Sequence, residues 1–220
     1  MSTELTEKEI EAIAKQLGCP DGELGLDVAQ TMEISNFSMT DKGIQALALE
    51  GGEKVLELGH GNASHLRHLL QPYVTYCGLD ISPLMKSEAE RINAEYIKNR
   101  SASFHLYDGF NIPFEDNTFH KALTVNTIYF WKEPIKFLNQ VCRVMKPGGQ
   151  FTVVFGHKAF MKNLPFTKYG FTLYTPKEVE DLVTQSNFTS TDCANYTDTV
   201  LFNNVGDQVT RDFSVLTAVK

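Results

Sequence analysis

A glycine-rich turn beside a carboxylate is the strongest chemical signal in this sequence. It reads E-L-G-H-G-N at residues 57–62 and lies within and after an apolar run that begins at Lys54. Gly59 and Gly61 allow a tight bend and let the backbone approach a ligand closely. A helix expected to begin at Ser64 would point its free N–H groups toward the same ligand. A G-x-G alone is weak evidence, but its place between a strand and a helix predicts a binding site.

Polar residues follow three other apolar runs. Asp80 stands at the end of the run 74–79, where a carboxylate can accept hydrogen bonds from both hydroxyls of a ribose. Asp108-Gly109 follows the run 103–107, and Asn126 and Tyr129 follow the run 121–125. Ligands of an open α/β sheet bind at the carboxyl ends of its strands, so we expect these residues to share one crevice.

The elements that must position these residues are strands alternating with helices. The expected strands are 54–58, 74–79, 103–107, 121–125, 151–155, 189–201 and 213–219. Helices are expected from Ser64, from Ser82-Pro83 to about Asn99, from Pro134 to Met145, and from a capping box at Thr175 to about Ser186. This alternation predicts an α/β fold with a doubly wound, Rossmann-like, mostly parallel seven-stranded sheet. The last two strands have only a turn at Gly206-Asp207 between them and should form a C-terminal antiparallel hairpin.

The first 50 residues predict a helical N-terminal extension. Thr6 and Glu9 have the spacing of a capping box, followed by apolar residues at helical period up to Gly18 and Pro20. A short helix near 27–32 and another over 41–49 are expected next. We therefore expect a helical lid segment, 1–50, that folds over the carboxyl edge of the sheet, and a binding domain, 51–220.

Taken in order, the motifs resemble those of the class I methyltransferases that use S-adenosylmethionine (SAM), over about residues 50–190. In that family an acidic residue precedes the glycine turn, and a turn like K-P-G-G at 146–149 precedes the fifth strand. The ensemble is similar to the small-molecule branch that includes quinone-biosynthesis C-methyltransferases. Two positions differ from the family pattern: Ala63 stands where a glycine is frequent, and His120 stands where many members have aspartate.

The resemblance implies SAM as the cofactor and gives each motif a role. Asp80 would bind the ribose, Ile81 would pack against the adenine, and Asp108 would bind the adenine amino group. The full expected set of cofactor-binding residues is Glu57, Gly59, Gly61, Asn62, Asp80, Ile81, Asp108, Gly109 and Asn126. It also implies an in-line displacement in which a small-molecule acceptor attacks the methyl group and S-adenosylhomocysteine is released. The protein would contribute mainly alignment and exclusion of water.

Catalytic side chains are less clearly marked. Asn126, Tyr129 and His157 are the candidates, with His157 as the candidate general base. The aromatic loop 163–174 would either cover an apolar or planar acceptor or be buried. O-, N- and C-methylation all stay open. So do two other functions, a non-catalytic SAM-binding protein and an NAD(P)-dependent oxidoreductase, although Ser64 replaces the third glycine of a dinucleotide fingerprint.

Composition and charge limit the classes of binding partner, the metal sites and the location that we expect for this protein. The net charge of −7 argues against a general nucleic-acid binder, and no apolar run is long enough for a membrane span. The four cysteines are scattered and the histidines lack metal-ligand spacing, so no metal site is expected. A charged N-terminus without signal-peptide character and scattered cysteines favour a cytoplasmic protein.

Overall fold

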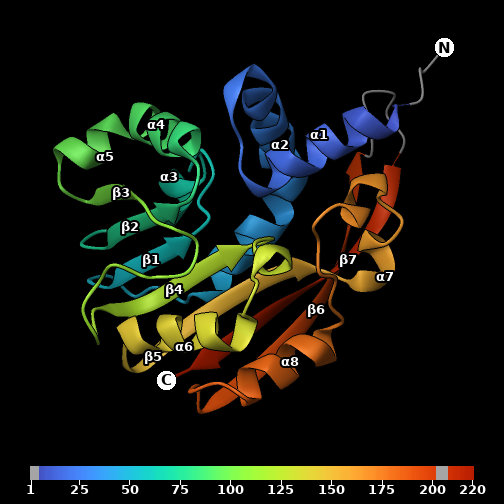
Figure 1. Cartoon of the computed structure of the whole chain (residues 1–220). Helices are drawn as coiled ribbons and strands as arrows, with labels where there is room; N and C mark the ends of the chain where they lie inside the picture. The colour runs from blue at the N-terminus through green and yellow to red at the C-terminus, as the bar shows by residue number, and fades with distance from the viewer. Residues whose placement is uncertain (1–4, 202–207) are drawn as a thin grey trace.

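Seven strands form a single sheet in the computed structural model, which describes residues 5–201 and 208–220. The strands are β1 (Lys54–Leu58), β2 (Thr75–Asp80), β3 (Ala102–Leu106), β4 (Phe119–Val125), β5 (Met145–Gly156), β6 (Ser190–Leu201) and β7 (Gln208–Val219). Their order across the sheet is β3-β2-β1-β4-β5-β7-β6. Strands β1 to β5 pair in parallel, whereas β7 lies antiparallel between β5 and β6. The predicted doubly wound sheet with a C-terminal hairpin is confirmed (Figure 1).

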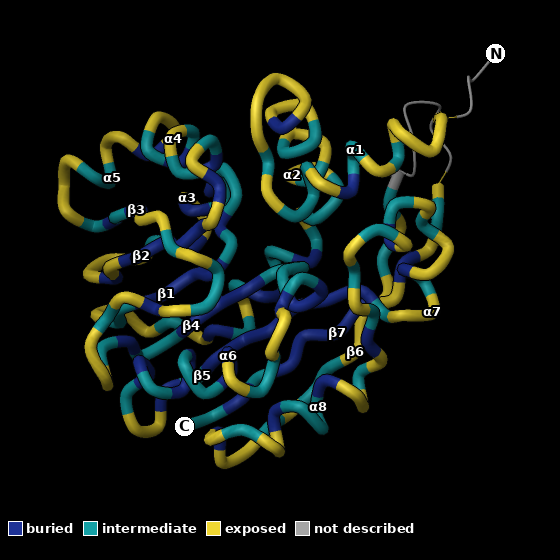
Figure 2. Tube along the Cα trace, viewed as in Figure 1, coloured by how far each residue is buried: buried dark blue, intermediate teal, exposed yellow. Residues whose placement is uncertain are grey.

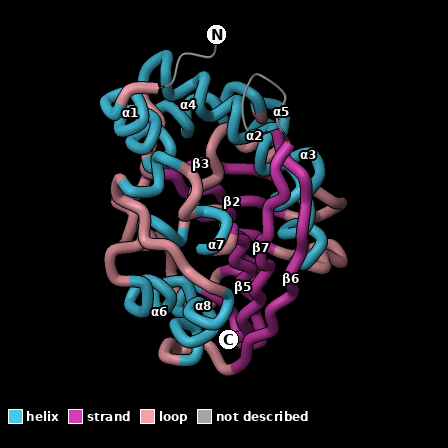
Figure 3. The backbone as a smooth tube through the Cα atoms, turned by 90° about the vertical axis from the view of Figure 1, so that its right-hand side faces the viewer, coloured by secondary structure: helices cyan, strands magenta, loops and turns pink. Residues whose placement is uncertain are grey.

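Helices cover both faces of the sheet. They are α1 (Glu7–Gly18), α2 (Gly22–Ala46), α3 (Leu66–Leu69), α4 (Pro83–Ile92), α5 (Ala94–Lys98), α6 (Pro134–Val144), α7 (Lys158–Met161) and α8 (Pro176–Thr184), with 3-10 turns η1 (Ile128–Phe130) and η2 (Pro165–Lys168). Figure 3 shows α6 and α8 on one side of the sheet and α3 on the other. Within the described residues, no helix is both long enough and apolar enough to cross a membrane.

Successive side chains of a strand point to opposite faces, so each central strand feeds two cores. In β1, Leu56 and Leu58 belong to the core under α6 and α8. Val55 belongs to the core on the α2 and α3 side. Figure 2 shows the strands as the most continuously buried part of the chain, with exposed residues concentrated on the helices and loops.

The predicted helix starts are mostly confirmed. Thr6 and Thr175 form capping boxes with Glu9 and Glu178, and Ser82 caps α4 by accepting from Met85 N. These caps satisfy N–H groups that have no partner within the helix. Local side-chain chemistry is therefore sufficient to fix where these helices begin.

The expectation for residues 20–49 is wrong. A single helix, α2, replaces the short helix at 27–32 and the separate helix at 41–49. Its middle, residues 28–40, lines a cavity and leaves Ile34 and Phe37 exposed, so no regular apolar period marks it. Its second half docks on the sheet through the buried Met39 and Gly43. Tertiary contacts, rather than amphipathic patterning, define this helix.

Three smaller expectations also need correction. Ser64 does not cap a helix: α3 begins at Leu66, its N-cap position is His65, and no side chain caps it. The helix expected to reach Asn99 breaks at Asn93, whose side-chain amide donates to two main-chain carbonyls. Strand β7 begins at Gln208 rather than at residue 213 because it pairs with the full length of β6. The expected turn at Gly206-Asp207 lies outside the described residues.

Candidate functional site

A cavity of about 420 Å³ opens beyond the carboxyl ends of β1, β2 and β4. It lies where the strand order reverses between β1 and β4, the switch point at which open α/β sheets bind ligands. Its polar end is formed by the loops after β1, β2 and β3, and its aromatic end by residues after β4 and β5. In Figure 1 the first half of α2 stands above the sheet between α4 and the segment that contains α7. Residues of α1 and α2 complete the cavity wall.

The glycine turn after β1 has two distinct roles. Gly59 adopts a φ of +71°, and a Cβ there would overlap the Cγ2 atom of Thr127. Gly61 has a φ of +55° but no atom within 4 Å of an added Cβ. Gly59 therefore lets two loops pack together, while Gly61 leaves open space at the polar end that a side chain would fill. Ala63, where the motif family often has glycine, is buried at a φ of +50°.

Asp80 is fixed by the same turn. Its two carboxylate oxygens accept from Gly61 N at 3.0 Å and Ser82 N at 2.9 Å, and the side chain lines the cavity. Burial raises the pKa of Asp80, opposed by the neighbouring His60 and by the backbone donors. A carboxylate held this way keeps lone pairs for a ligand hydroxyl.

Glu57 also lines the cavity, within a buried cluster that spacing did not predict. Its Oε2 accepts from the Tyr76 hydroxyl at 2.6 Å and lies 2.8 Å from His65 Nε2. Burial acts to raise the pKa of Glu57, but the charge and hydrogen bond of His65 and the Tyr76 hydroxyl outweigh it and lower the pKa. The carboxylate is thus held charged at the polar end, where it can attract a cation.

Two neighbours of the turn have other partners. Asn62 donates from Nδ2 to Glu33 of α2 at 2.8 Å, which ties the turn to the cavity cover. The ring of His60 packs over Gly78, where a Cβ would lie 2.6 Å from its Cδ2 atom. Burial is the main influence on the pKa of His60 and lowers it. His60 is therefore a neutral packing residue beside two carboxylates.

The third motif, Asp108-Gly109 after β3, has one residue in the cavity wall and one outside it. Gly109, with a φ of +84°, lines the cavity next to Ile81, which is 40% exposed and also lines it. The carboxylate of Asp108 is exposed, and it accepts from the backbone of Phe110 and from Asn111. Asp108 is not among the lining residues. The structure therefore brings Ile81 and Gly109 to the cavity and leaves Asp108 beside it.

Asn126 and Tyr129 form one hydrogen-bonded unit on the wall between the two ends. Asn126, at a φ of +58°, accepts from the Tyr129 hydroxyl at 3.0 Å and donates to Asn36 Oδ1 at 3.1 Å. The same hydroxyl accepts from Gly156 N at 2.6 Å. Burial raises the pKa of Tyr129 well above its ordinary value. Both residues line the cavity, as the sequence predicts, with Tyr129 as a neutral hydroxyl.

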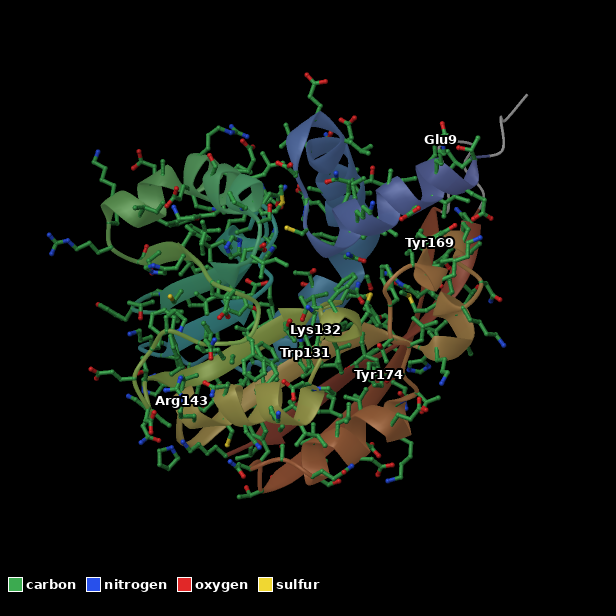
Figure 4. The ribbon with its side chains drawn as sticks, viewed as in Figure 1. Glu9, Trp131, Lys132, Arg143, Tyr169 and Tyr174 are labelled. Atoms are coloured by element: carbon green, nitrogen blue, oxygen red, sulfur yellow. The ribbon has the colours of Figure 1, made fainter. Side chains whose placement is uncertain are left out.

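The aromatic end is built from side chains after β4 and β5. They are Phe130, Trp131, Phe160, Met161, Leu164, Phe166 and Phe171. Phe130 and Phe171 have ring centroids 4.6 Å apart, and Trp131 lies past the end of β4 (Figure 4). The aromatic loop 163–174 therefore contributes side chains to the wall of the cavity.

His157 is not brought to this site. Its Nε2 lies 2.7 Å from Ser214 Oγ, which in turn donates to Asn195, and His157 does not line the cavity. Burial lowers its pKa. His157 therefore links β5 to the hairpin of β6 and β7. In the described ranges, no three His, Cys, Asp or Glu side chains gather in a way that could hold a metal ion.

Sequence reasoning missed two parts of the wall. Met32, Asn36 and Met39 of α2 line the cavity, and so does Arg211 of β7. Asn36 and Met39 contact the side chain of Asn126, so they lie beside a predicted residue. No motif marks Arg211; the only sequence signal was a cation within a strand otherwise rich in apolar residues.

Comparison with known proteins matches part of this chain to methyltransferase domains. A family model described as a methyltransferase domain matches residues 56–153, which run from β1 into β5. A fatty-acid O-methyltransferase of Mycolicibacterium smegmatis is 29% identical over 137 residues, 60% of this chain and 47% of that protein. A phthiotriol/phenolphthiotriol dimycocerosates methyltransferase of Mycobacterium tuberculosis is 33% identical over 108 residues, 46% of this chain and 37% of that protein. The match spans less than half the length of either relative.

The fold extends the likeness over the whole chain. The solved structure of Haemonchus contortus phospholethanolamine N-methyltransferase 2, in complex with phosphomonomethylethanolamine and S-adenosylhomocysteine, has a TM-score of 0.72. It is 15% identical and covers 100% of this chain and 61% of that protein. At this identity the comparison concerns the fold.

Proposed function

We propose, from the premise that this chain carries a class I methyltransferase domain, that it transfers the methyl group of SAM to a small apolar acceptor. The carrying observation is the cavity at the switch point, with two buried carboxylates at one end and an aromatic wall at the other. SAM is a cation with a ribose, and the polar end offers a charged Glu57 and a ribose-accepting Asp80. The apolar acceptors named for the two relatives support an acceptor of the same character.

The residues at the polar end fit SAM. The open space over Gly61 admits a ligand against the backbone, and Asp80 keeps acceptor capacity beside it. We assign SAM binding to Glu57, Gly59, Gly61, Asn62, Asp80, Ile81, Gly109 and Asn126, with Gly59 and Asn62 acting through the shape of the turn. Asp108 joins this proposed set through the adenine amino group, from its position next to Gly109.

Bound SAM would supply a methyl group on a good leaving group. The chain's own residues therefore need only bind the donor and the acceptor, align them, and shield the reacting atoms from water. Asn126 and Tyr129 hold each other in place on the wall between the two ends. The aromatic side chains exclude water and orient the acceptor, which converts a bimolecular encounter into an aligned one. Tyr129 orients Asn126 without exchanging a proton, because its hydroxyl is buried and hydrogen-bonded.

We propose that residues 1–50 form the cover of this site, with residues 51–220 as the SAM-binding domain. Helix α1 and the middle of α2 supply one wall, and the carbonyl of Pro20 between the two helices accepts from Ser82 Oγ at 2.5 Å. At the far end of α1, Glu7 accepts from Lys168, the last residue of η2, and from Tyr169, which follows it. The cover therefore contacts the body at two separate places, near α4 and near η2.

Isothermal titration with SAM, S-adenosylhomocysteine and NAD tests the donor. We expect both SAM compounds to bind and NAD not to bind, because a carboxylate at position 57 repels a pyrophosphate. Asp80→Asn should weaken SAM binding about 10-fold or more, since it removes a charged acceptor. Asp192→Asn, the same change on the exposed edge strand β6, is the matched control. Tight NAD binding without SAM binding would favour the oxidoreductase, and SAM binding without turnover on any acceptor would favour the non-catalytic protein.

We also propose a cytoplasmic location. All four cysteines, Cys19, Cys77, Cys142 and Cys193, are free thiols, which is typical of a reducing compartment. Fractionation of cells that express the chain, followed by thiol labelling, would test this proposal.

A further inference from the structure

The charged side chains that line the cavity include both carboxylates and arginines. The three acidic ones, Glu33, Glu57 and Asp80, are hydrogen-bonded to the residues of the polar end. Two arginines also line the cavity: Arg67 of α3, and Arg211 of β7, which contacts Asn36 of α2 and is paired with the Asp198 carboxylate. Because Arg211 and Asp198 together carry no net charge, the preference comes from hydrogen bonding: a guanidinium can only donate, so an anion can accept from an N–H that Asp198 leaves free, and an ammonium cannot.

Arg211 projects from β7 and is only 5% exposed. Its Nε and Nη2 donate to the Asp198 carboxylate at 3.1 and 2.7 Å, and Nη2 also donates to the Ser35 carbonyl. Its Nη1 makes a longer contact of 3.3 Å to Asn36 Oδ1, the oxygen that also accepts from Asn126. The Asn36 contact is the longest hydrogen bond of this guanidinium, so it is the one that a ligand oxygen can replace.

No general base faces the aromatic end of the cavity in the parts of the chain that the structure describes. The Tyr129 hydroxyl is committed to Asn126 and to the backbone of Gly156, and His157 lies outside the cavity. The lining histidines belong to the loop after β1 and to the α3 region, at the polar end. An acceptor that must lose a proton to react would therefore find no partner for that proton.

Resting on the proposed function, we propose that the acceptor is an apolar carboxylate. Its head group would bind Nη1 of Arg211 and Nδ2 of Asn36, and its body would lie among the aromatic side chains. A lone pair of one carboxylate oxygen forms the new O–C bond, while the S–C bond of the donor breaks and its electron pair stays on sulfur. The negative and positive charges cancel, no proton moves, and the products are a methyl ester and S-adenosylhomocysteine.

The test compares three head groups on the same body. Octanoate, octanol and octylamine, and the corresponding naphthalene carboxylate, alcohol and amine, are titrated into the full chain saturated with S-adenosylhomocysteine. We expect each carboxylate to bind about 10-fold more tightly or better than its alcohol and amine, as one charge-assisted hydrogen bond provides. With SAM present, mass spectrometry should detect the methyl ester.

Arg211→Lys should lower the carboxylate preference severalfold and leave S-adenosylhomocysteine affinity unchanged, because lysine keeps the charge but loses the planar donor pair. Arg143→Lys is the matched control, since Arg143 donates to Asp116 and two carbonyls outside the cavity. Octanol or octylamine binding as tightly as octanoate, or no binding of either carboxylate, overturns the acceptor assignment and leaves the donor assignment standing. Failure of S-adenosylhomocysteine to bind overturns the proposed function itself. The wild-type comparison decides the matter if Arg211→Lys does not fold.

Discussion

At the scale of single residues, the two glycines of the first turn are needed for different reasons: Gly59 for packing against Thr127, and Gly61 for open space at the polar end of the cavity. Gly59→Ala should lower the free energy of unfolding by about 1–3 kcal/mol, because the new Cβ overlaps Thr127 and the left-handed backbone is strained. Gly61→Ala carries the strain alone, about 1 kcal/mol, but it fills ligand space. Denaturant unfolding and SAM titration on both variants should show Gly59→Ala losing stability and Gly61→Ala losing affinity.

The double variant Gly59→Ala with Thr127→Ser sharpens this test. Serine lacks the overlapping Cγ2 atom and keeps the hydroxyl that lies 2.5 Å from Thr124 Oγ1. The second substitution should recover part of the stability lost in the first. Additive losses would show that backbone strain, and not the contact with Thr127, is the whole cost.

The pair of His65 and Glu57 makes stability depend on pH. Burial acts to lower the pKa of His65, but the charge and hydrogen bond of Glu57 outweigh it, so the pKa is raised above 6.5. A raised histidine pKa contributes stability that is fully present below the unfolded value and is lost as the pH rises through the folded value. Urea unfolding above pH 6.5 should therefore show wild type losing more stability with rising pH than His65→Gln.

His68→Gln is the control for this pH dependence, because His68 is exposed on the same short helix. It should follow the wild-type curve. Parallel curves for wild type and His65→Gln would contradict the ion pair.

The predicted residues that the structure brings to the cavity share a local signal. Glu57, Gly61 and Asp80 lie at strand ends that are visible as apolar runs, and the switch-point rule brings such ends together. The partners of Glu57 gave no such signal, because Tyr76 reads as a strand residue and His65 as a solvated helix residue. The same limit applied to Asp108, since the sequence does not tell whether a turn carboxylate binds its own backbone or a ligand.

At the scale of elements, α2 is held to the sheet by a close approach at Gly43. An added Cβ there would lie 2.9 Å from both Leu123 Cδ1 and Val154 Cγ2. Gly43→Ala should destabilise the chain by about 1–3 kcal/mol through overpacking, against a helix-propensity gain of about 1 kcal/mol. Thermal or urea unfolding measures the net effect, with Thr31→Ala on the exposed face of the same helix as the control. Net stabilisation would show that the sheet yields at this contact.

The contact of α1 with η2 offers a test of the cover. Glu7 accepts from Lys168 at 2.7 Å and from the Tyr169 hydroxyl, on an exposed surface. Glu7→Lys should raise the KM for the acceptor about two- to fivefold, the range expected of an exposed ion pair. SAM affinity, measured by calorimetry, should stay the same because the polar end is untouched.

The charge swap Glu7→Lys with Lys168→Glu restores the pair with reversed signs. It should return the acceptor KM toward the wild-type value. A swap that behaves like Glu7→Lys alone would show that the contact does not hold the cover over the site.

At the scale of the whole molecule, the sequence predicts the sheet and most of its helices better than it predicts the wall of the cavity. Strand identities, most helix starts and the C-terminal hairpin follow from period-2 and period-3.6 patterns and from caps, which are local. The cavity wall draws Asn36, Asn126 and Arg211 from three distant segments and joins them by long-range hydrogen bonds. No local pattern specifies such a meeting, so α2 was divided wrongly and Arg211 was missed.

The parts of the cavity wall come from different regions of the chain, so they are completed at different times during biosynthesis. The polar end is complete in sequence once Gly109 has been made, but Arg211 belongs to β7, which inserts between β5 and β6. Contacts that join positions so far apart form late, because closing a long loop costs chain entropy. A nascent polypeptide in which β7 has not yet joined the sheet would have the polar end of the cavity but not the part of the wall that contains Arg211. Selectivity for the second substrate would thus be the last property that the emerging protein acquires.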